Sequence, residues 1–210
     1  MMKRKLSLIA LALLLMLVAS CTSVSQPGAF QIVDPDGNIA YIDTTTGDLV
    51  TVPEDHNQIH DGNSYTVSDI QNVNAGTFKW QITTPNSTTY AHMIFHVDCT
   101  GEMMVSITEG SDRTDGTAMA EINRNRNSSN TATVVVTHTP TGGSTDGAVT
   151  IFADRIGSTG TGPIGGSSSG TRGENEYILK ANTKYVVAVT TYDDVYVSAE
   201  FDWYEQAPLN

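Results

Sequence analysis

Apolar side chains recur at every second position through most of the chain after residue 63, and this period of two limits the possible folds more than any other feature. Successive side chains of an extended strand point to opposite faces, so alternate residues share one face of a sheet. Residues 131–137 and 149–153 are further extended runs, rich in β-branched residues. The clearest alternating sets are Phe78, Trp80 and Ile82; Met93, Phe95 and Val97; Met103, Val105 and Ile107; Tyr185, Val187, Val189 and Thr191; and Val197, Ala199, Phe201 and Trp203.

Clusters of turn-forming residues separate these runs. They occupy residues 112–116, 123–130, 139–147 and 157–173. No stretch of ten or more residues after residue 20 combines helical periodicity with capping residues. The pattern predicts an all-β fold over residues 55–206, an antiparallel β-sandwich of about eight strands with either a jelly-roll or an immunoglobulin-like topology.

Three segments between and before the predicted strands differ from them in composition. Residues 157–173 are dominated by glycine and serine, which predicts a long flexible loop between two strands. Residues 31–54 contain extended runs around an Asp36-Gly37 turn, which predicts a short N-terminal β-hairpin region. Residues 21–30 are mostly small and polar, and we expect them to form a flexible tether.

The first 20 residues have the three-part build of a secretory signal peptide. A basic start is followed by an apolar run over residues 6–18, which is shorter than the roughly 20 residues needed to span a bilayer. Ala19 and Ser20 then precede Cys21. This arrangement resembles the lipobox of bacterial lipoproteins, which implies an acylated Cys21 and a mature chain anchored outside the cytoplasm, at the bacterial cell envelope or surface. An ordinary signal peptide and a short uncleaved anchor are the alternatives.

The mature chain is strongly acidic. Removing residues 1–20 takes away three basic residues and no acidic residue, so the formal charge changes from −12 to −15. That balance argues against binding to DNA or RNA. With Cys21 acylated, Cys99 is the one remaining cysteine, so no intrachain disulfide can form. Cys99 lies in strand-like sequence, and we expect a buried, unreactive thiol.

The sequence contains no catalytic motif of a known hydrolase type, since neither Gly-x-Ser-x-Gly nor His-Glu-x-x-His occurs. Residues 160–165 match the letters of a dinucleotide-binding fingerprint, but the strand before it and the helix after it are missing from the pattern. Neighbouring carboxylates, such as Asp193 and Asp194, fit solvated turns. We therefore expect no enzyme activity and no cofactor.

The histidines and the aspartate-rich turns do not predict a metal site. His92 and His96 lie in a strand pattern, where a spacing of four separates them by about 13 Å, too far to share one ion. The same spacing suits chelation on a helix, but we expect His56 and His60 in a loop, and two ligands alone do not make a site. Two Asp-Gly turns carry oxygen ligands of the kind calcium prefers, and turn formation alone explains both; they span residues 34–38 and 112–116.

Two aromatic residues fall on the polar face of the last strand. Tyr196 and Tyr204 alternate with the apolar set of that strand. Exposed tyrosines of this kind bind sugars or a partner sheet by stacking and contact. The competing interpretation, which we favour, is a strand buried on both faces of the sandwich.

Three segments in a fixed order carry a family resemblance. The first is residues 55–62, the second residues 123–134 followed by 138–141, and the third residues 176–185 with 201–205. Together they resemble small β-sandwich structural proteins of tailed bacteriophages, in the class of capsid decoration and minor virion proteins. The resemblance implies a non-enzymatic module that docks on a repeated surface as a homo-oligomer, such as a trimer.

Arg124 and Arg126 are then the candidate contact residues, because guanidinium groups favour planar carboxylate and backbone partners. A solvated, turn-rich approach to a strand is the equally simple alternative. Phage capsids assemble in the cytoplasm, so the lipobox departs from the pattern of that family. We therefore predict a lipid-anchored surface module that acts by protein–protein or surface contact, and the alternative function is a carbohydrate-binding surface lipoprotein.

Overall fold

The computed structural model describes residues 49, 53–157, 166–168 and 175–208. The chain divides into two compact units, residues 1–51 and 52–210, and Leu49 is the one described residue of the first. The predicted signal peptide, the tether and nearly all of the predicted N-terminal hairpin region therefore lie outside the described residues. The fold below is that of the second unit.

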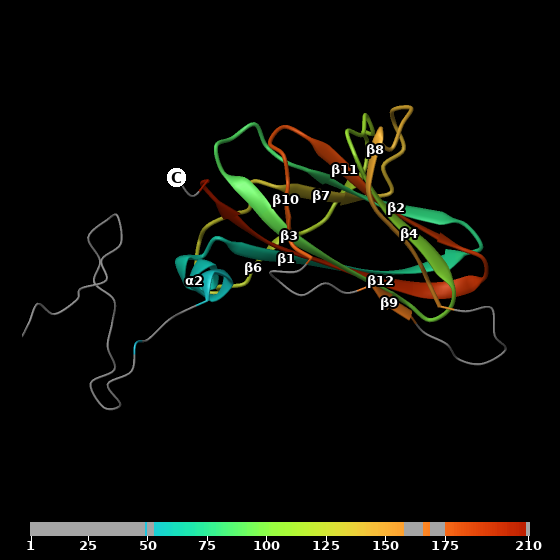
Figure 1. Ribbon diagram of the computed structural model, residues 1–210, viewed down its shortest axis with the longest axis horizontal. Coiled ribbons are helices and arrows are strands. Elements are labelled where there is room, and N and C mark those ends of the chain that lie inside the picture. Colours follow the sequence, from blue (N-terminus) through green and yellow to red (C-terminus); the bar gives the residue numbers. More distant parts are fainter. Residues whose placement is uncertain (1–48, 50–52, 158–165, 169–174, 209–210) are drawn as a thin grey trace, which may run out of the picture. The chain divides into compact units, whose positions relative to one another are not determined.

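Twelve strands in the described part of the chain form two antiparallel sheets that pack face to face (Figure 1). The first, here the β12 sheet, has the order β10-β3-β12-β1-β6, and β9 also pairs with β3. The second, the β11 sheet, has the order β5-β7-β2-β11-β4-β8. The strands are β1 (Ser64–Asn74), β2 (Thr77–Thr83), β3 (Tyr90–Cys99), β4 (Met103–Glu109), β5 (Thr117–Ala118), β6 (Ile122–Asn123), β7 (Val135–His138), β8 (Val149–Ile156), β9 (Gly166–Ser168), β10 (Tyr177–Ile178), β11 (Lys184–Thr191) and β12 (Asp194–Gln206).

The predicted β-sandwich is confirmed, and the strand order decides its topology. Without the edge pieces β5, β6, β7 and β9, eight strands remain, and consecutive ones lie in opposite sheets except β4 and β8. Their spatial orders, β10-β3-β12-β1 and β2-β11-β4-β8, are those of a jelly roll. In the immunoglobulin fold the first two strands share a sheet. The jelly-roll alternative is therefore the correct one.

The core lies between the two sheets and is built from the alternating sets. All of their members are buried except Phe78, which is half-buried. Aromatic rings fill the centre: Trp80 and Phe201 meet edge to face with centroids 6.0 Å apart, and Phe95 meets Phe201 at 5.9 Å. Edge-to-face contact is a favourable geometry for aromatic pairs. The faces expected from the period of two are thus confirmed.

Two predicted segments differ from the structure. The extended run over residues 131–137 forms a strand only from Val135, because the backbone N–H groups of Thr133 and Val134 donate to the Glu205 carboxylate and not to a neighbouring strand. Within the predicted loop over residues 157–173, three residues form β9 and pair with β3. Short strands at a sheet edge reduce its exposed, unpaired length.

A short helix, α2 (Glu54–Asp61), stands where the sequence predicts a loop. It ends at Gly62, whose φ of 75° is left-handed and whose N–H bonds to the Ile59 carbonyl. A Cβ at Gly62 would also lie 2.2 Å from the Ser128 hydroxyl oxygen. Isolated helices of this length are not stable. Tertiary contact holds α2, because Gln58 is buried and accepts a hydrogen bond from the Asn63 amide.

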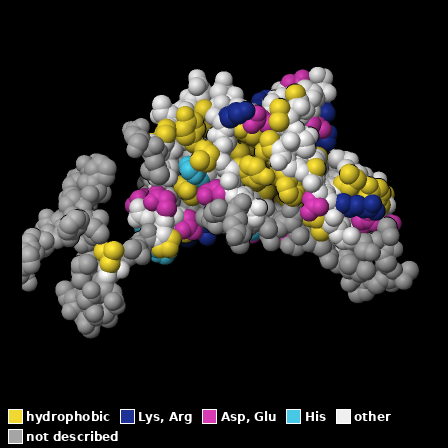
Figure 2. All heavy atoms as spheres, in the orientation of Figure 1, with side chains coloured by type: hydrophobic (Ala, Val, Ile, Leu, Met, Phe, Trp, Pro, Cys, Tyr) yellow, Lys and Arg dark blue, Asp and Glu magenta, His cyan; other side chains and the backbone are white. Residues whose placement is uncertain are grey.

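Four basic side chains on the β11-sheet side form ion pairs, whereas Lys184 donates to the Arg113 carbonyl. Lys79 and Arg113 both contact Asp146, at 2.6 and 2.7 Å. Burial raises the pKa of Asp146, but the hydrogen bonds from Lys79 and Arg113 outweigh it and leave the pKa below its usual value. Figure 2 shows basic side chains lying beside acidic ones on the visible face. The other pairs join Lys180 to Glu109 and Arg155 to Glu102.

Candidate functional site

The outer side of the β12 sheet is acidic. Its three long strands, β1, β3 and β12, carry no lysine or arginine, and four of their six acidic residues lie on the outer side. The side chains of Asp98, Asp194 and Glu200 are exposed, and Asp202 is half-buried on the same side. We call the outward side chains of these three strands the acidic face. Its charge repels polyanionic ligands.

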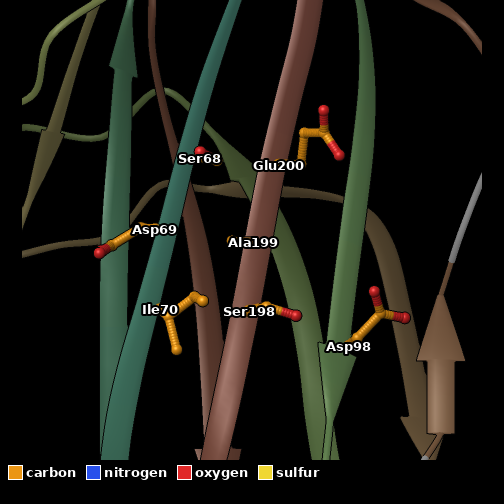
Figure 3. A pocket seen from close by; sticks show the side chains of 7 residues that line it. All are labelled: Ser68, Asp69, Ile70, Asp98, Ser198, Ala199 and Glu200. Carbon is orange, nitrogen blue, oxygen red and sulfur yellow. The ribbon is translucent and has the colours of Figure 1, made fainter.

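A groove of about 470 Å³ crosses the acidic face (Figure 3). Strand register places Ser68 opposite Glu200 and Ser198 opposite both Ile70 and Asp98, so the lining comes from three adjacent strands. The side chains of Asp98 and Glu200 point to the same side in Figure 3. Two further residues complete the lining, Asp69 and Ala199.

Tyr196 stands beside this groove. It lies two residues before Ser198 on the same face of β12, about 7 Å along the strand. Its side chain is 59% exposed, and its backbone N–H donates to the Thr100 hydroxyl. The favoured interpretation, a strand buried on both faces, is therefore wrong at Tyr196, which lies on an open polar face.

Tyr204 behaves differently, because at this residue the favoured interpretation of a strand buried on both faces is confirmed and an exposed contact role is not. It is 6% exposed and stacks on His92, with ring centroids 4.5 Å apart and planes at 16°. His92 lies directly opposite Tyr204 in the register of β3 and β12. A cross-strand ring pair of this kind covers both partners. The two tyrosines thus lie on the same face of β12, but Tyr196 is exposed and Tyr204 is buried.

Arg124 and Arg126 lie on the exposed loop after β6. The Arg124 N–H donates to the Ser64 carbonyl at the start of β1, and an Arg126 guanidinium N–H donates to the Asn123 carbonyl. Tyr196 pairs with Asn72, eight residues further along β1, which corresponds to about 26 Å. The structure therefore separates the two candidate arginines from Tyr196 and places them at the opposite end of the sheet.

The Asp112 turn, one of the two calcium candidates, is closed by the protein's own donors. The Asp112 carboxylate accepts hydrogen bonds from the Thr145 and Ser144 backbone N–H groups and from the Ser144 hydroxyl. These bonds lower the pKa of Asp112 to about 2. These hydrogen bonds of the turn explain the position of the Asp112 carboxylate without a bound ion. The other candidate turn, residues 34–38, lies outside the described residues.

The histidines fall in two different settings. His96 lies opposite Glu200, and His92 stacks on Tyr204. The two histidines of β3 therefore do not converge on one point. His56 and His60 lie on α2, where their Nε2 atoms are 3.0 Å apart. The prediction of a loop at these two residues is therefore wrong, since the Gly62 cap and the buried Gln58 hold a helix there.

Of the two cysteines, Cys99 lies among the described residues and Cys21 does not. Cys99 is buried at 6% exposure, and its thiol donates to the Gly101 carbonyl, which confirms the expected buried thiol. Cys21 lies outside the described residues. Among the helices of the described residues, none is long and apolar enough to cross a membrane.

Two acidic residues with structural roles were missed at the sequence level. Asp69 faces inward on β1 and accepts a 2.8 Å hydrogen bond from the buried Trp80 indole. Glu205 accepts bonds from the backbone of Thr133 and Val134 and from the Trp203 indole. The available signal was their position in the apolar phase of the alternation, where an acid needs donors.

Comparison with known proteins adds no relative. No protein-family model matches the chain, and neither a curated protein nor a solved structure matches it.

Proposed function

We propose that this protein is a lipid-anchored, non-catalytic binding module whose acidic face takes hydroxyl-rich glycans of the cell envelope. The observation that carries the proposal is the exposed Tyr196 ring beside a groove lined by Asp98, Glu200 and two serines. Carboxylates and hydroxyls accept hydrogen bonds from sugar hydroxyl groups, and a tyrosine ring stacks on the apolar face of a sugar. The lack of lysine and arginine on the three strands favours neutral or cationic glycans.

The jelly roll supports this proposal only in general terms. The same architecture serves lectin domains and viral capsid proteins. A fold hosts many functions, and the function follows from the site. The acidic face is therefore the stronger argument, and it is what the experiments below address.

The lipid anchor rests on the sequence of residues 1–21. In a bacterial host we expect signal cleavage before Cys21 and acylation of its thiol and new amino group. Mass spectrometry of the mature N-terminal peptide checks this, with Cys21→Ser as the control that removes the acceptor thiol. A chain that still begins at Met1, or an unmodified Cys21, contradicts the anchor and leaves the acidic-face proposal standing.

Replacing Tyr196 with alanine is expected to weaken glycan binding about tenfold, because one aromatic stacking contact contributes up to about 1.5 kcal/mol. The measurement is affinity electrophoresis against soluble neutral, cationic and anionic polysaccharides, followed by titration calorimetry with the strongest ligand. Glu200→Gln is expected to weaken binding less, since the amide keeps one acceptor oxygen.

The matched control is Tyr192→Ala. Tyr192 is 51% exposed and contacts Met104, an exposed residue of the β11 sheet, so its loss removes a similar exposed ring outside the groove lining. We expect unchanged glycan affinity for this variant. Equal loss in Tyr192→Ala and Tyr196→Ala, or no binding to any polysaccharide, contradicts the glycan proposal.

A second candidate function is protein contact of the kind that the phage resemblance implies. It is favoured by Arg124 and Arg126, which are both exposed and have no carboxylate partner among the ion pairs of the described residues. Light scattering coupled to size-exclusion chromatography distinguishes the candidates. A stable trimer that dissociates in Arg124→Ala/Arg126→Ala supports protein contact.

A further inference from the structure

We infer that His56 and His60 form a two-imidazole site for a divalent transition metal, with Cu²⁺ as the preferred ion. The site goes beyond the proposed glycan binding and does not depend on it. Both side chains are exposed on α2, one helical turn apart. Residues four apart on a helix lie on the same face, so both imidazoles can reach one ion.

The two imidazoles already lie close enough to share one ion. Their Nε2 atoms are 3.0 Å apart, a hydrogen-bonding distance, and the rings meet at 73° with centroids 4.7 Å apart. Two bonds of about 2.1 Å to one ion place the nitrogens about 3.0 to 3.4 Å apart at angles of about 90° to 109°, so a small side-chain rotation replaces the ring-to-ring hydrogen bond with a shared metal. Imidazole suits Cu²⁺, Ni²⁺ and Zn²⁺, and of these Cu²⁺ binds a given nitrogen site most tightly.

The helix that carries the pair is fixed at both ends. Glu54 accepts hydrogen bonds from Gln58, at 2.7 Å, and from Gln206 of β12, at 3.0 Å. At the other end the backbone carbonyl of His60 accepts a hydrogen bond from the Asn125 side-chain amide, and the imidazole takes no part in this bond. The backbone positions of the two histidines are therefore set before a metal arrives, which reduces the ordering that binding requires.

The described part of the protein supplies only these two ligands. It contains no group of three or more His, Cys, Asp or Glu side chains that could hold a metal ion. The remaining coordination positions are therefore open to water or to an outside ligand. A copper chelate that leaves two adjacent positions free, Cu²⁺–nitrilotriacetate, is the matching probe.

The test titrates the full chain with Cu²⁺–nitrilotriacetate by calorimetry and records electron paramagnetic resonance spectra. We expect one equivalent to bind with two imidazole nitrogens in the spectrum. His56→Ala and His60→Ala should each weaken binding at least about tenfold, because the second imidazole otherwise binds at high effective concentration. Ni²⁺ should bind more weakly than Cu²⁺ in the same titration.

Two controls separate the pair from single histidines. His138→Ala removes a lone histidine on β7 and should leave the affinity unchanged. His60→Ala/Asp61→His keeps the number of histidines but changes their spacing to five, and it should bind as weakly as His60→Ala. Circular dichroism verifies that each variant is folded. Wild-type affinity no higher than that of His60→Ala, or full affinity in the respaced variant, overturns the inference.

Discussion

Replacing Trp80 with alanine is expected to lower the free energy of unfolding by about 4 kcal/mol, the range measured for large aromatic residues in protein cores. Trp80 is fully buried at the centre of the sandwich and packs on Phe78 and Phe201, with ring centroids 4.8 and 6.0 Å away. Its indole N–H also donates to Asp69. The variant therefore leaves a cavity and removes one of the two donors of Asp69, which keeps its bonds from Gln71.

Trp80→Phe separates these two effects. It keeps an aromatic ring in the core but removes the indole N–H, and we expect a loss of about 2 kcal/mol, typical of a hydrogen bond to a charged group plus some lost volume. Urea denaturation measures the free energy of unfolding of both variants. The midpoint concentration of urea should fall while the m-value, the slope of the free energy against urea concentration, stays unchanged. A loss below about 1 kcal/mol in Trp80→Ala would show that the core does not depend on this ring.

Replacing Glu205 with alanine is expected to cost about 3 kcal/mol, because bonds to a charged acceptor contribute more than neutral ones. Its carboxylate accepts four hydrogen bonds, two from Thr133, one from the Val134 N–H and one from the Trp203 indole. Val134 is 2% exposed, so the segment that Glu205 holds is part of the core. Without the carboxylate, two backbone N–H groups lose their partner.

The matched control for this variant is Glu200→Ala. Glu200 lies on the same strand but points outward and is exposed. Exposed substitutions away from specific contacts usually change stability by less than about 0.5 kcal/mol. Similar losses in the two variants would contradict the role of Glu205 as a hydrogen-bonding clamp. Hydrogen exchange at the amides of Thr133 and Val134 should accelerate in Glu205→Ala alone.

The long strands could be predicted because their signal is local. The pleat of a strand fixes a period of two, and one buried face makes that period visible in the sequence. β4 is the plainest example, since Met103 and Val105 are buried and Met104 between them is 47% exposed. The same reasoning gave the inward face of β12 correctly.

The errors arise where a cap or a tertiary contact, which leaves no periodic signal, decides the local structure. The helix α2 depends on the cap at Gly62 and on the burial of Gln58, neither of which creates a helical period in eight residues. The start of β7 depends on Glu205, which lies about 70 residues away and takes the N–H groups that a longer strand would use. Tyr204 is buried because β3 places His92 opposite it.

By itself the sequence determined the all-β class, the faces of the long strands and the expectation of a lipid anchor at Cys21, because each of these depends on residue order within short windows. The tertiary structure alone decided the jelly-roll order, the groove beside Tyr196 and the helix that brings His56 to His60. These features need strands or side chains to meet in space. Such meetings depend on packing across the whole domain, which no local pattern encodes.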